Sequence, residues 1–299
     1  MSIRLRFRSL PLISVLALTG SLLALPSTVA AGSASTCTVV NRTQGTTYHV
    51  LQSAANTASS YDVLQVRGLC FGTTTISQNL FIQGRTTAAG PAILDGDGGG
   101  RVLWINAGYT VGIRNLKIRH GLAHYDGIDV LTGQGGGIYN KGRLRLTNVV
   151  VRDNRGEADG GGMFVDGGRL ALKGNTTVRK NFGGGVLVYQ GVMSMWNTSS
   201  VYGNTEGVTY GGGVWSEASQ FTMNDSSTIF GNAAPFLGGG LYADESGSVT
   251  MNDASSIHDN SVASGGGGGI SYWCGDVTLA GVVAGGNVHG NSPDDVACS

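Results

Sequence analysis

A two-part signature recurs six times in the second half of the chain and restricts its fold more than any other feature. Each copy opens with three glycines and an aliphatic residue, as in GGGIYN, and closes with a β-branched residue, two variable residues and asparagine, as in VRDN. The triplets begin at Gly135, Gly160, Gly183, Gly211, Gly238 and Gly267, and the closing asparagines are Asn154, Asn181, Asn204, Asn232, Asn260 and Asn291. A repeat of this length predicts a solenoid, because one unit cannot bury its own apolar face.

Short strings such as LRLTNVVV and SVTMNDASSI lie between the two marks, and they alternate with the period of half-buried strands. Upstream, the strings DVLQVRG, TTISQNLFIQG, PAILDG, RVLWI and VGIRNLKIRHG follow the same pattern and add about three further units. Stacked units pair in parallel at a ladder spacing of about 4.8 Å. We therefore expect an all-β fold, a parallel β-helix of about nine coils.

The six closing asparagines predict a structural ladder. An inward-facing amide at the same place in every coil can bond its equivalents above and below, as in stacked cross-β structures. The chain has 51 glycines and only 5 prolines. Glycine of this density allows the tight turns and close backbone approach that stacked coils require.

The first residues have the order of a secretory signal peptide. Three arginines, Arg4, Arg6 and Arg8, precede an apolar stretch that ends in the small residues STVAAGSAS. We expect cleavage between residues 31 and 35. No later stretch is apolar enough to span a bilayer. The sequence thus predicts a secreted protein, extracellular or at the cell surface, whose mature chain has no membrane span.

The mature chain is expected to form one domain, with a signal peptide at 1–31 and the β-helix at 32–299. The segment 32–134 holds an N-terminal cap and the early coils, and 135–299 holds the six glycine-triplet coils. The string YHVLQSAANTAS, which begins at Tyr48, has apolar residues at helical spacing. We expect it to form a short helix that caps the open end of the core.

Four cysteines, Cys37, Cys70, Cys274 and Cys298, occur as one pair near each end of the mature chain. An even number of cysteines in an exported chain predicts disulfides. The simplest pairing joins Cys37 to Cys70 and Cys274 to Cys298. The chain lacks the CxxC spacing and histidine clusters that a structural zinc site would need.

The run from DVLQVRG through VGIRNLKIRHG to GGGIYNKGRLRLTNVVVRDN resembles the right-handed β-helix proteins of the pectin-lyase-like superfamily. Its repeats are similar to the passenger repeats of chlamydial polymorphic outer membrane proteins, although Val or Ile replaces their Phe before the asparagine. The resemblance covers nearly all of the mature chain and implies a right-handed coil. We expect no C-terminal barrel of the kind that those outer membrane proteins carry, and hence no self-translocation.

Charge and motif content argue against several functions. Lys and Arg together equal Asp and Glu at 19 each, and three arginines lie in the leader. We therefore expect no basic stripe and no nucleic-acid partner. The sets of catalytic residues used by polygalacturonase-like and pectate-lyase-like members of the superfamily are not found together, so the sequence favours a protein without catalytic activity. No cofactor is expected. Asp95 and Asp97, in LDGDGGG, are a weak candidate for calcium, since calcium prefers oxygen ligands on tight turns.

One position in each repeat is a candidate for binding. The residue after the aliphatic one is Tyr139, Phe164, Leu187, Trp215 or Tyr242 in the first five copies. If the aliphatic side chain faces the core, this side chain faces outward, and stacking aligns the set as an exposed stripe. Carboxylates two residues further along would flank it. Such a stripe suits sugar rings or a protein partner, whereas the alternatives are a self-stacking ladder or a register that buries the rings.

These features favour a secreted, non-catalytic β-helix that presents a repetitive surface to a polysaccharide or a surface protein, as an adhesin or an envelope-associated protein does. A carbohydrate-active lyase or hydrolase is the alternative, and a purely structural passenger is the third reading. The fold cannot distinguish them, because unrelated functions share it.

Overall fold

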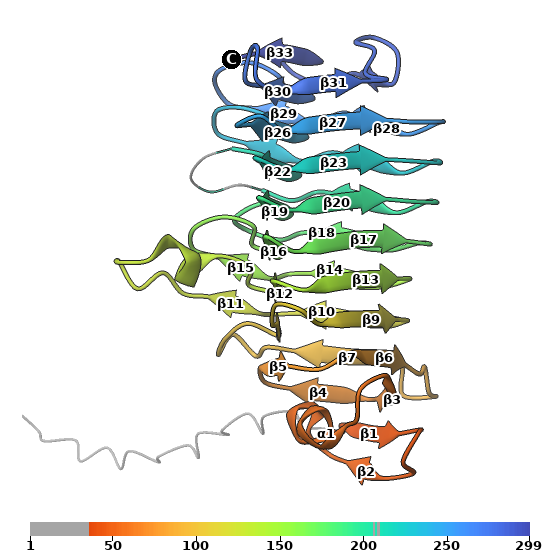
Figure 1. The fold of residues 1–299 in the computed structure, drawn as a ribbon. Helices are drawn as coiled ribbons and strands as arrows, with labels where there is room; N and C mark the ends of the chain where they lie inside the picture. Colours follow the sequence, from red (N-terminus) through yellow and green to blue (C-terminus); the bar gives the residue numbers. More distant parts are fainter. Residues whose placement is uncertain (1–35, 206, 208–209) are drawn as a thin grey trace, which may run out of the picture. The chain divides into compact units, whose positions relative to one another are not determined.

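The computed structural model describes residues 36–205, 207 and 210–299, and residues 35–299 form one compact unit. The expected signal peptide lies outside the described residues. Three parallel sheets, here called A, B and C, run along this unit, and each contains nine stacked parallel strands (Figure 1). The prediction of a parallel β-helix with about nine coils is confirmed.

Each coil contributes one strand to each sheet, in the order A, B, C. Sheet A contains β3 (Asp62–Arg67), β6 (Leu80–Gly84), β9 (Thr110–Arg114), β13 (Arg143–Thr147), β17 (Arg169–Lys173), β20 (Val192–Met195), β23 (Gln220–Met223), β27 (Ser248–Met251) and β31 (Thr278–Ala280). Sheet B contains β4 (Leu69–Phe71), β7 (Ala92–Asp95), β10 (Leu116–Arg119), β14 (Val150–Arg152), β18 (Thr177–Arg179), β21 (Ser200–Tyr202), β24 (Thr228–Phe230), β28 (Ser256–His258) and β32 (Val288–His289). Sheet C contains β5 (Thr74–Ile76), β8 (Leu103–Ile105), β12 (Ile138–Asn140), β16 (Met163–Asp166), β19 (Val186–Tyr189), β22 (Val214–Glu217), β26 (Leu241–Asp244), β30 (Ile270–Tyr272) and β33 (Val296–Cys298).

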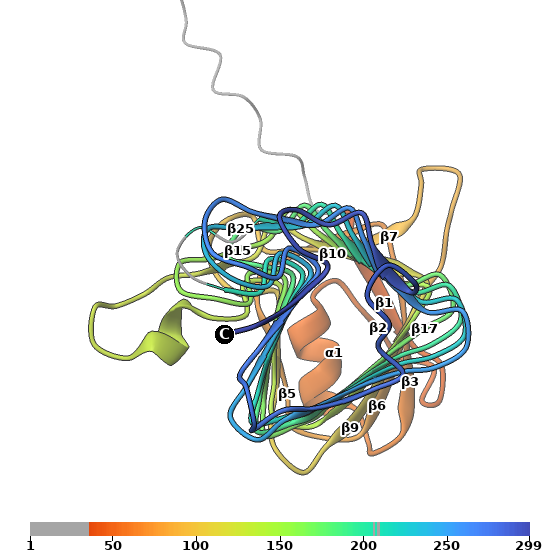
Figure 2. The ribbon, with the colours of Figure 1, turned by 90° about the horizontal axis from the view of Figure 1, so that it is seen from above.

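The remaining elements are short. An antiparallel pair, β1 (Thr38–Asn41) and β2 (Thr47–Tyr48), extends sheet A at its N-terminal edge. Two small parallel pairs lie outside the main sheets: β11 (Leu122–Ala123) with β15 (Arg155–Gly156), and β25 (Ala233–Ala234) with β29 (Ser261–Val262). In Figure 2 the chain rises toward the viewer and passes from sheet A to B to C anticlockwise, so the coil is right-handed.

The interior is filled by the inward side chains of the alternating strands. Leu144 of β13, for example, lies between Val111 and Leu170 of its neighbouring strands, and all three are buried. Each buried aliphatic side chain of this size stabilises the fold by about 1.5–3 kcal/mol. One continuous cluster of such residues extends from Cys37 to Val288.

The asparagine ladder is present and unbroken. The Nδ2 atom of each ladder asparagine donates to Oδ1 of the next one, at 2.9–3.0 Å, from Asn154 through to Asn291. The backbone N–H of each asparagine bonds the same oxygen at 2.9–3.1 Å. These buried amides are therefore satisfied, as a buried polar network must be.

In the second triplet, the three glycines are required for three different reasons. Gly160 adopts φ +61°, a backbone conformation that is strained for any residue with a side chain. A Cβ on Gly161 would collide with the carbonyl oxygen of Phe182 in the next coil. A Cβ on Gly162 would lie 2.9 Å from Nδ2 of Asn181, a ladder residue. The triplet and the asparagine thus recur together because they pack against each other.

Both ends of the solenoid show the features expected from the sequence. The helix α1 (Leu51–Thr57) buries Leu51, Ala54 and Ala55 and lies within the outline of the coils in Figure 2. The disulfides Cys37–Cys70 and Cys274–Cys298 are both formed. No helix within the described part of the chain is long and apolar enough to cross a membrane.

Two loops in the early coils project from the otherwise regular solenoid. One follows β11 and carries a 3-10 helix, Val130–Gly133, before the chain enters β12. The other, residues 85–91, joins β6 to β7. Figure 2 shows both loops extending beyond the outline of the stacked coils, on different sides.

Candidate functional site

The predicted stripe lies on the outward face of sheet C, and its alignment is confirmed. Six residues on consecutive strands are register partners: Trp104, Tyr139, Phe164, Leu187, Trp215 and Tyr242. Tyr139, Phe164 and Leu187 form an apolar cluster separate from the interior core. The side chains therefore point away from the core, as the alternation predicts.

The expectation that this stripe is exposed is wrong. Tyr139 is 2% exposed, Phe164 1% and Tyr242 7%, and the two tryptophans, Trp104 and Trp215, keep an intermediate exposure. Leu131, in the projecting loop after β11, packs onto the cluster of Tyr139, Phe164 and Leu187, in the N-terminal part of the stripe. A column of apolar side chains left in water would be costly, and the loop removes that cost by covering it. The stripe is thus mostly a second core.

Arg101 holds the covering loop in place. Its Nη2 donates to the carbonyl oxygens of Leu131 and Thr132, each at 2.7 Å, and its Nε donates to that of Gln134 at 2.9 Å. The guanidinium carbon also lies 5.1 Å from the ring centre of Trp104 and 5.2 Å from that of Tyr139. One cation thus ties the loop to two rings of the stripe.

The carboxylates that flank the stripe differ in their surroundings. Asp166 accepts a hydrogen bond from the Tyr139 hydroxyl at 2.7 Å and pairs with Lys141 at 3.0 Å. Further along the stripe, the pKa of Glu217 is raised to about 7. Burial is the main cause, and the negative charges of nearby carboxylates, chiefly Asp244, add to it. Burial likewise raises the pKa of Asp244 to about 6. The hydrogen bond that Asp244 accepts from the Trp215 indole at 3.3 Å acts in the opposite direction and lowers this pKa. These two carboxylates are register partners on β22 and β26.

The calcium candidate Asp95 has other partners. Its carboxylate is buried, accepts from Arg119 Nε at 2.7 Å and lies 3.2 Å from His120 Nδ1. It also accepts the backbone N–H of Asp97 at 3.0 Å, which shapes the turn. No group of three or more His, Cys, Asp or Glu side chains suited to a metal occurs among the described residues. Calcium binding at Asp95 and Asp97 stays a prediction that these contacts do not favour.

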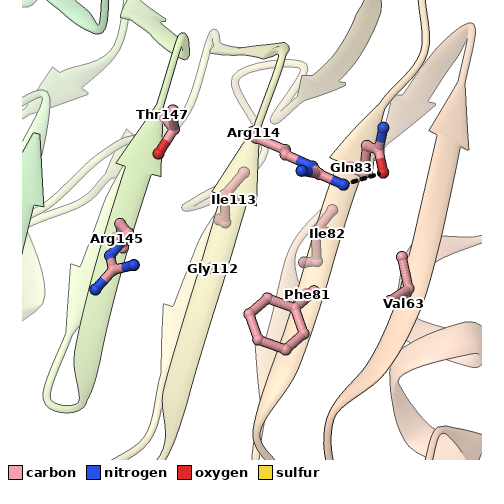
Figure 3. A pocket seen from close by; sticks show the side chains of 9 residues that line it. All are labelled: Val63, Phe81, Ile82, Gln83, Gly112, Ile113, Arg114, Arg145 and Thr147. Carbon is pink, nitrogen blue, oxygen red and sulfur yellow. Dashed lines mark hydrogen bonds between the residues drawn. The ribbon is translucent and has the colours of Figure 1, made fainter. Parts of the chain in front are cut away.

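The open surface lies instead on the outward face of sheet A. A hollow of about 400 Å³ is lined by Phe81, Gly112, Arg114 and Arg145 among others (Figure 3). A neighbouring hollow of about 500 Å³ shares Phe81 and Arg145 and continues to Arg143 and Arg169. Together they form a shallow groove across β6, β9, β13 and β17, which we call the sheet A groove.

Small residues open this groove. Arg145 lies in register between Gly112 and Ala171, so neither residue directly opposite it is bulky. The ring of Phe81 lies over Gly112, where a Cβ would be 2.9 Å from the ring. Figure 3 shows Phe81 and Arg145 projecting from the face, with Arg114 bonded to Gln83. Phe81 is 48% exposed, which is a large value for an apolar side chain beside a groove.

The groove is cationic. Arg143, Arg145 and Arg169 form no ion pair among the described residues, in contrast to the paired Arg119 and Arg152. Arg143 and Arg169 are also register partners, and like charges opposite each other destabilise a sheet. The expectation of no basic stripe is therefore wrong for this face. The overall charge balance conceals a local separation of charge.

Sequence reasoning missed these arginines although their pattern was visible. The strings RLRLT and RLALK place Arg143, Arg145 and Arg169 at the positions that alternate with inward leucines. The same rule that pointed to the stripe on sheet C assigns them outward.

Comparison of the chain with protein-family models, with curated proteins and with solved structures found no match. The resemblance to the pectin-lyase-like superfamily and to the chlamydial repeats therefore stays a prediction. The assignment of a function rests on the surfaces themselves.

Proposed function

We propose that this protein is a secreted β-helix that binds an anionic polysaccharide along the sheet A groove without cleaving it. The observation that carries the proposal is the set of three guanidinium groups, on Arg143, Arg145 and Arg169, that have no carboxylate partner. Arg143 and Arg169 lie directly opposite each other on neighbouring strands, and the repulsion of their like charges destabilises the folded chain. An anionic ligand would offset that cost and would use the forked donors of arginine.

The form of the groove supports an extended ligand rather than a compact one. It runs across consecutive strands at a ladder step of about 4.8 Å, so its lining groups are spread over several coils. Phe81, exposed at one end, offers a ring face against which a sugar can pack. Serine and threonine side chains among the lining residues, such as Thr110 and Ser194, offer further hydrogen bonds.

The lining residues also support binding without catalysis. Hydrolysis of a glycosidic bond generally uses two carboxyl groups. The residues that line the two hollows include neither aspartate nor glutamate, and neither histidine nor cysteine. Their charged members are all arginines.

The test is a glycan array of neutral, carboxylated and sulfated polysaccharides probed with residues 32–299. The variant carrying Arg143→Gln, Arg145→Gln and Arg169→Gln is the principal comparison. Arg152→Gln, which removes a paired arginine on sheet B, is the matched control. We expect preferential binding of anionic glycans and a loss of affinity of about 10-fold or more per groove arginine, since hydrogen bonds to charged groups contribute about 1.5–3 kcal/mol. The control should bind as the wild type does.

Three results would reject the proposal. Equal binding by the triple variant would place the ligand elsewhere, and equal binding of duplex DNA would show a general affinity for polyanions. Binding to proteins but to no glycan would favour the surface-protein reading.

One observation favours the hydrolytic alternative, at a different place. Glu217 and Asp244 are register partners beside Trp215, and their raised pKa values would let one be protonated while the other is ionised. Retaining glycosidases hold two carboxyl groups about 5–5.5 Å apart for that purpose. Release of reducing sugar by the wild type, abolished by Glu217→Gln and unaffected by the groove variant, would establish this alternative.

A further inference from the structure

A third hollow lies outside the sheet A groove, at the corner where the chain turns from sheet A to sheet B. It has a volume of about 450 Å³, and its lining includes Arg85, Lys117, Asn115 and Asn148. Arg85 belongs to the projecting loop 85–91, and Lys117 is on β10. We propose that this corner hollow binds a compact tetrahedral oxyanion, a phosphate or sulfate group carried on a small molecule or a glycan.

Charge is the first argument. Arg85 and Lys117 form no ion pair among the described residues. The hollow has no acidic lining residue, and Asp95 on β7 and Asp153 just after β14 are already paired with arginines. Two free cations therefore face one small hollow. Together they match the charge of a phosphate monoester, about −1.5 to −2 at neutral pH, better than that of a single carboxylate.

The donor types are the second argument. The planar guanidinium of Arg85 can bond two oxygens of a phosphate or sulfate at once, and the ammonium of Lys117 acts as a point charge. The side-chain amides of Asn115 and Asn148 lie on the same hollow, and Asn148 donates to Asn115 at 3.4 Å, a long and weak bond. A tetrahedral group presents oxygens in several directions and can use these donors together.

The projecting loop is the third argument. In the coils before and after this loop, a single residue joins the sheet A strand to the sheet B strand: Gly68 in one coil and Asn115 in the other. The second coil instead uses residues 85–91, closed by paired bonds between Thr87 and Gly90 at 2.9 and 3.0 Å. Residues 85–89 are exposed, so the insertion buries little apolar surface. A loop that adds little to the core and supplies a cation to a hollow is typical of a binding element.

This inference does not rest on the proposed function, because the corner hollow shares no lining residue with the sheet A groove. The test measures the midpoint temperature of thermal unfolding of residues 32–299 as the concentration of inorganic phosphate, sodium sulfate or sodium glucuronate is raised. Sodium chloride holds the ionic strength constant. Glucose 6-phosphate and glucose 6-sulfate then distinguish a phosphate ester from a sulfate ester as the bound group.

We expect a saturable rise with phosphate or sulfate that exceeds the rise with glucuronate. The variant Arg85→Gln/Lys117→Gln should lose at least 10-fold in apparent affinity. Arg143→Gln/Arg169→Gln, with the same change of charge, should retain it. Arg85→Lys/Lys117→Arg keeps both charges and should restore part of the response, which excludes a folding defect as the cause.

The inference is overturned if the wild type gives no saturable response at constant ionic strength. It is also overturned if glucuronate binds equally well, or if the corner variant and the groove variant lose affinity equally. Failure of the polysaccharide to bind the groove on the array would leave this measurement unaffected.

Discussion

The outward faces of sheets A and C belong to the same coils and obey the same alternation, yet they have opposite properties. On sheet C the outward column of rings is covered, and Tyr139 and Phe164 are almost inaccessible to solvent. On sheet A the outward side chains of β9 and β13 line an open groove and carry unpaired positive charge. The strand period decides which way a side chain points. A covering loop decides whether that side chain reaches water.

The comparison makes a first prediction about stability. Phe164→Ala removes a ring that is 1% exposed from the second core, so we expect a loss of about 3–5 kcal/mol in the free energy of unfolding. Arg169 is an outward residue on β17 of sheet A, and Arg169→Ala should change the free energy of unfolding by no more than about 0.5 kcal/mol. Denaturant unfolding measures both. Similar losses for the two variants would contradict the distinction between the faces.

A second prediction concerns the loop that covers sheet C. Arg101→Gln removes three bonds to loop carbonyl oxygens, and we expect a loss of about 2–3 kcal/mol together with faster amide exchange in residues 124–134. Arg143→Gln is the control, since that guanidinium makes no ion pair among the described residues. Unchanged exchange in the loop would show that packing alone holds it.

A third prediction concerns pH. Because the pKa of Glu217 rises from 4.5 to about 7 and that of Asp244 from 3.8 to about 6 on folding, the folded chain binds more protons than the unfolded chain between these values. Their contribution to stability is fully present below pH 3.8 and is lost as the pH rises through 6 to 7. Glu217→Gln should remove much of this decline, about 1 kcal/mol after allowance for solvent screening.

Unfolding midpoints of the wild type and of Glu217→Gln between pH 4 and pH 8, at about constant ionic strength, measure this effect. Asp276→Asn removes an exposed carboxylate and is the control. A wild type whose stability rises across the same interval, or a variant with the same slope, would contradict the assigned environment of Glu217.

The smallest expected effect on stability is that of Phe81→Ala. Its ring is 48% exposed, so we expect the free energy of unfolding to change by no more than about 0.5 kcal/mol. Affinity for an anionic polysaccharide should nevertheless fall about 3- to 10-fold, since ring packing contributes about 1 kcal/mol. A large loss of stability would show that the ring belongs to the core rather than to the groove.

The fold was predictable because its repeat is constrained at several points at once. The triplet and the asparagine recur together since the third glycine leaves room for the ladder amide, as Gly162 does for Asn181. Alternation in strings such as RLRLT gave the strands, and paired cysteines near each end gave the two disulfides. Each of these signals is local, and all of them agree.

The candidate site was less predictable because it depends on contacts between distant segments. Whether Tyr139 is exposed depends on Leu131, which reaches it from a loop with no repeat pattern. The sheet A groove depends on Gly112 lying beside Arg145, residues that the chain separates by a full coil. Alternation identifies Arg145 as outward, but it carries no information about the size of the residues opposite it.

The direction of the asparagine ladder has a consequence for how such a protein can change its length. Every ladder amide donates to the next coil, and the last, Asn291, donates to the carboxylate of Asp295 at 3.0 Å. A duplicated internal coil would accept from one neighbour and donate to the other, so the solenoid could gain or lose whole coils. Asp295 differs, because an ionised carboxylate accepts and cannot donate onward. It therefore ends this series of donating amides.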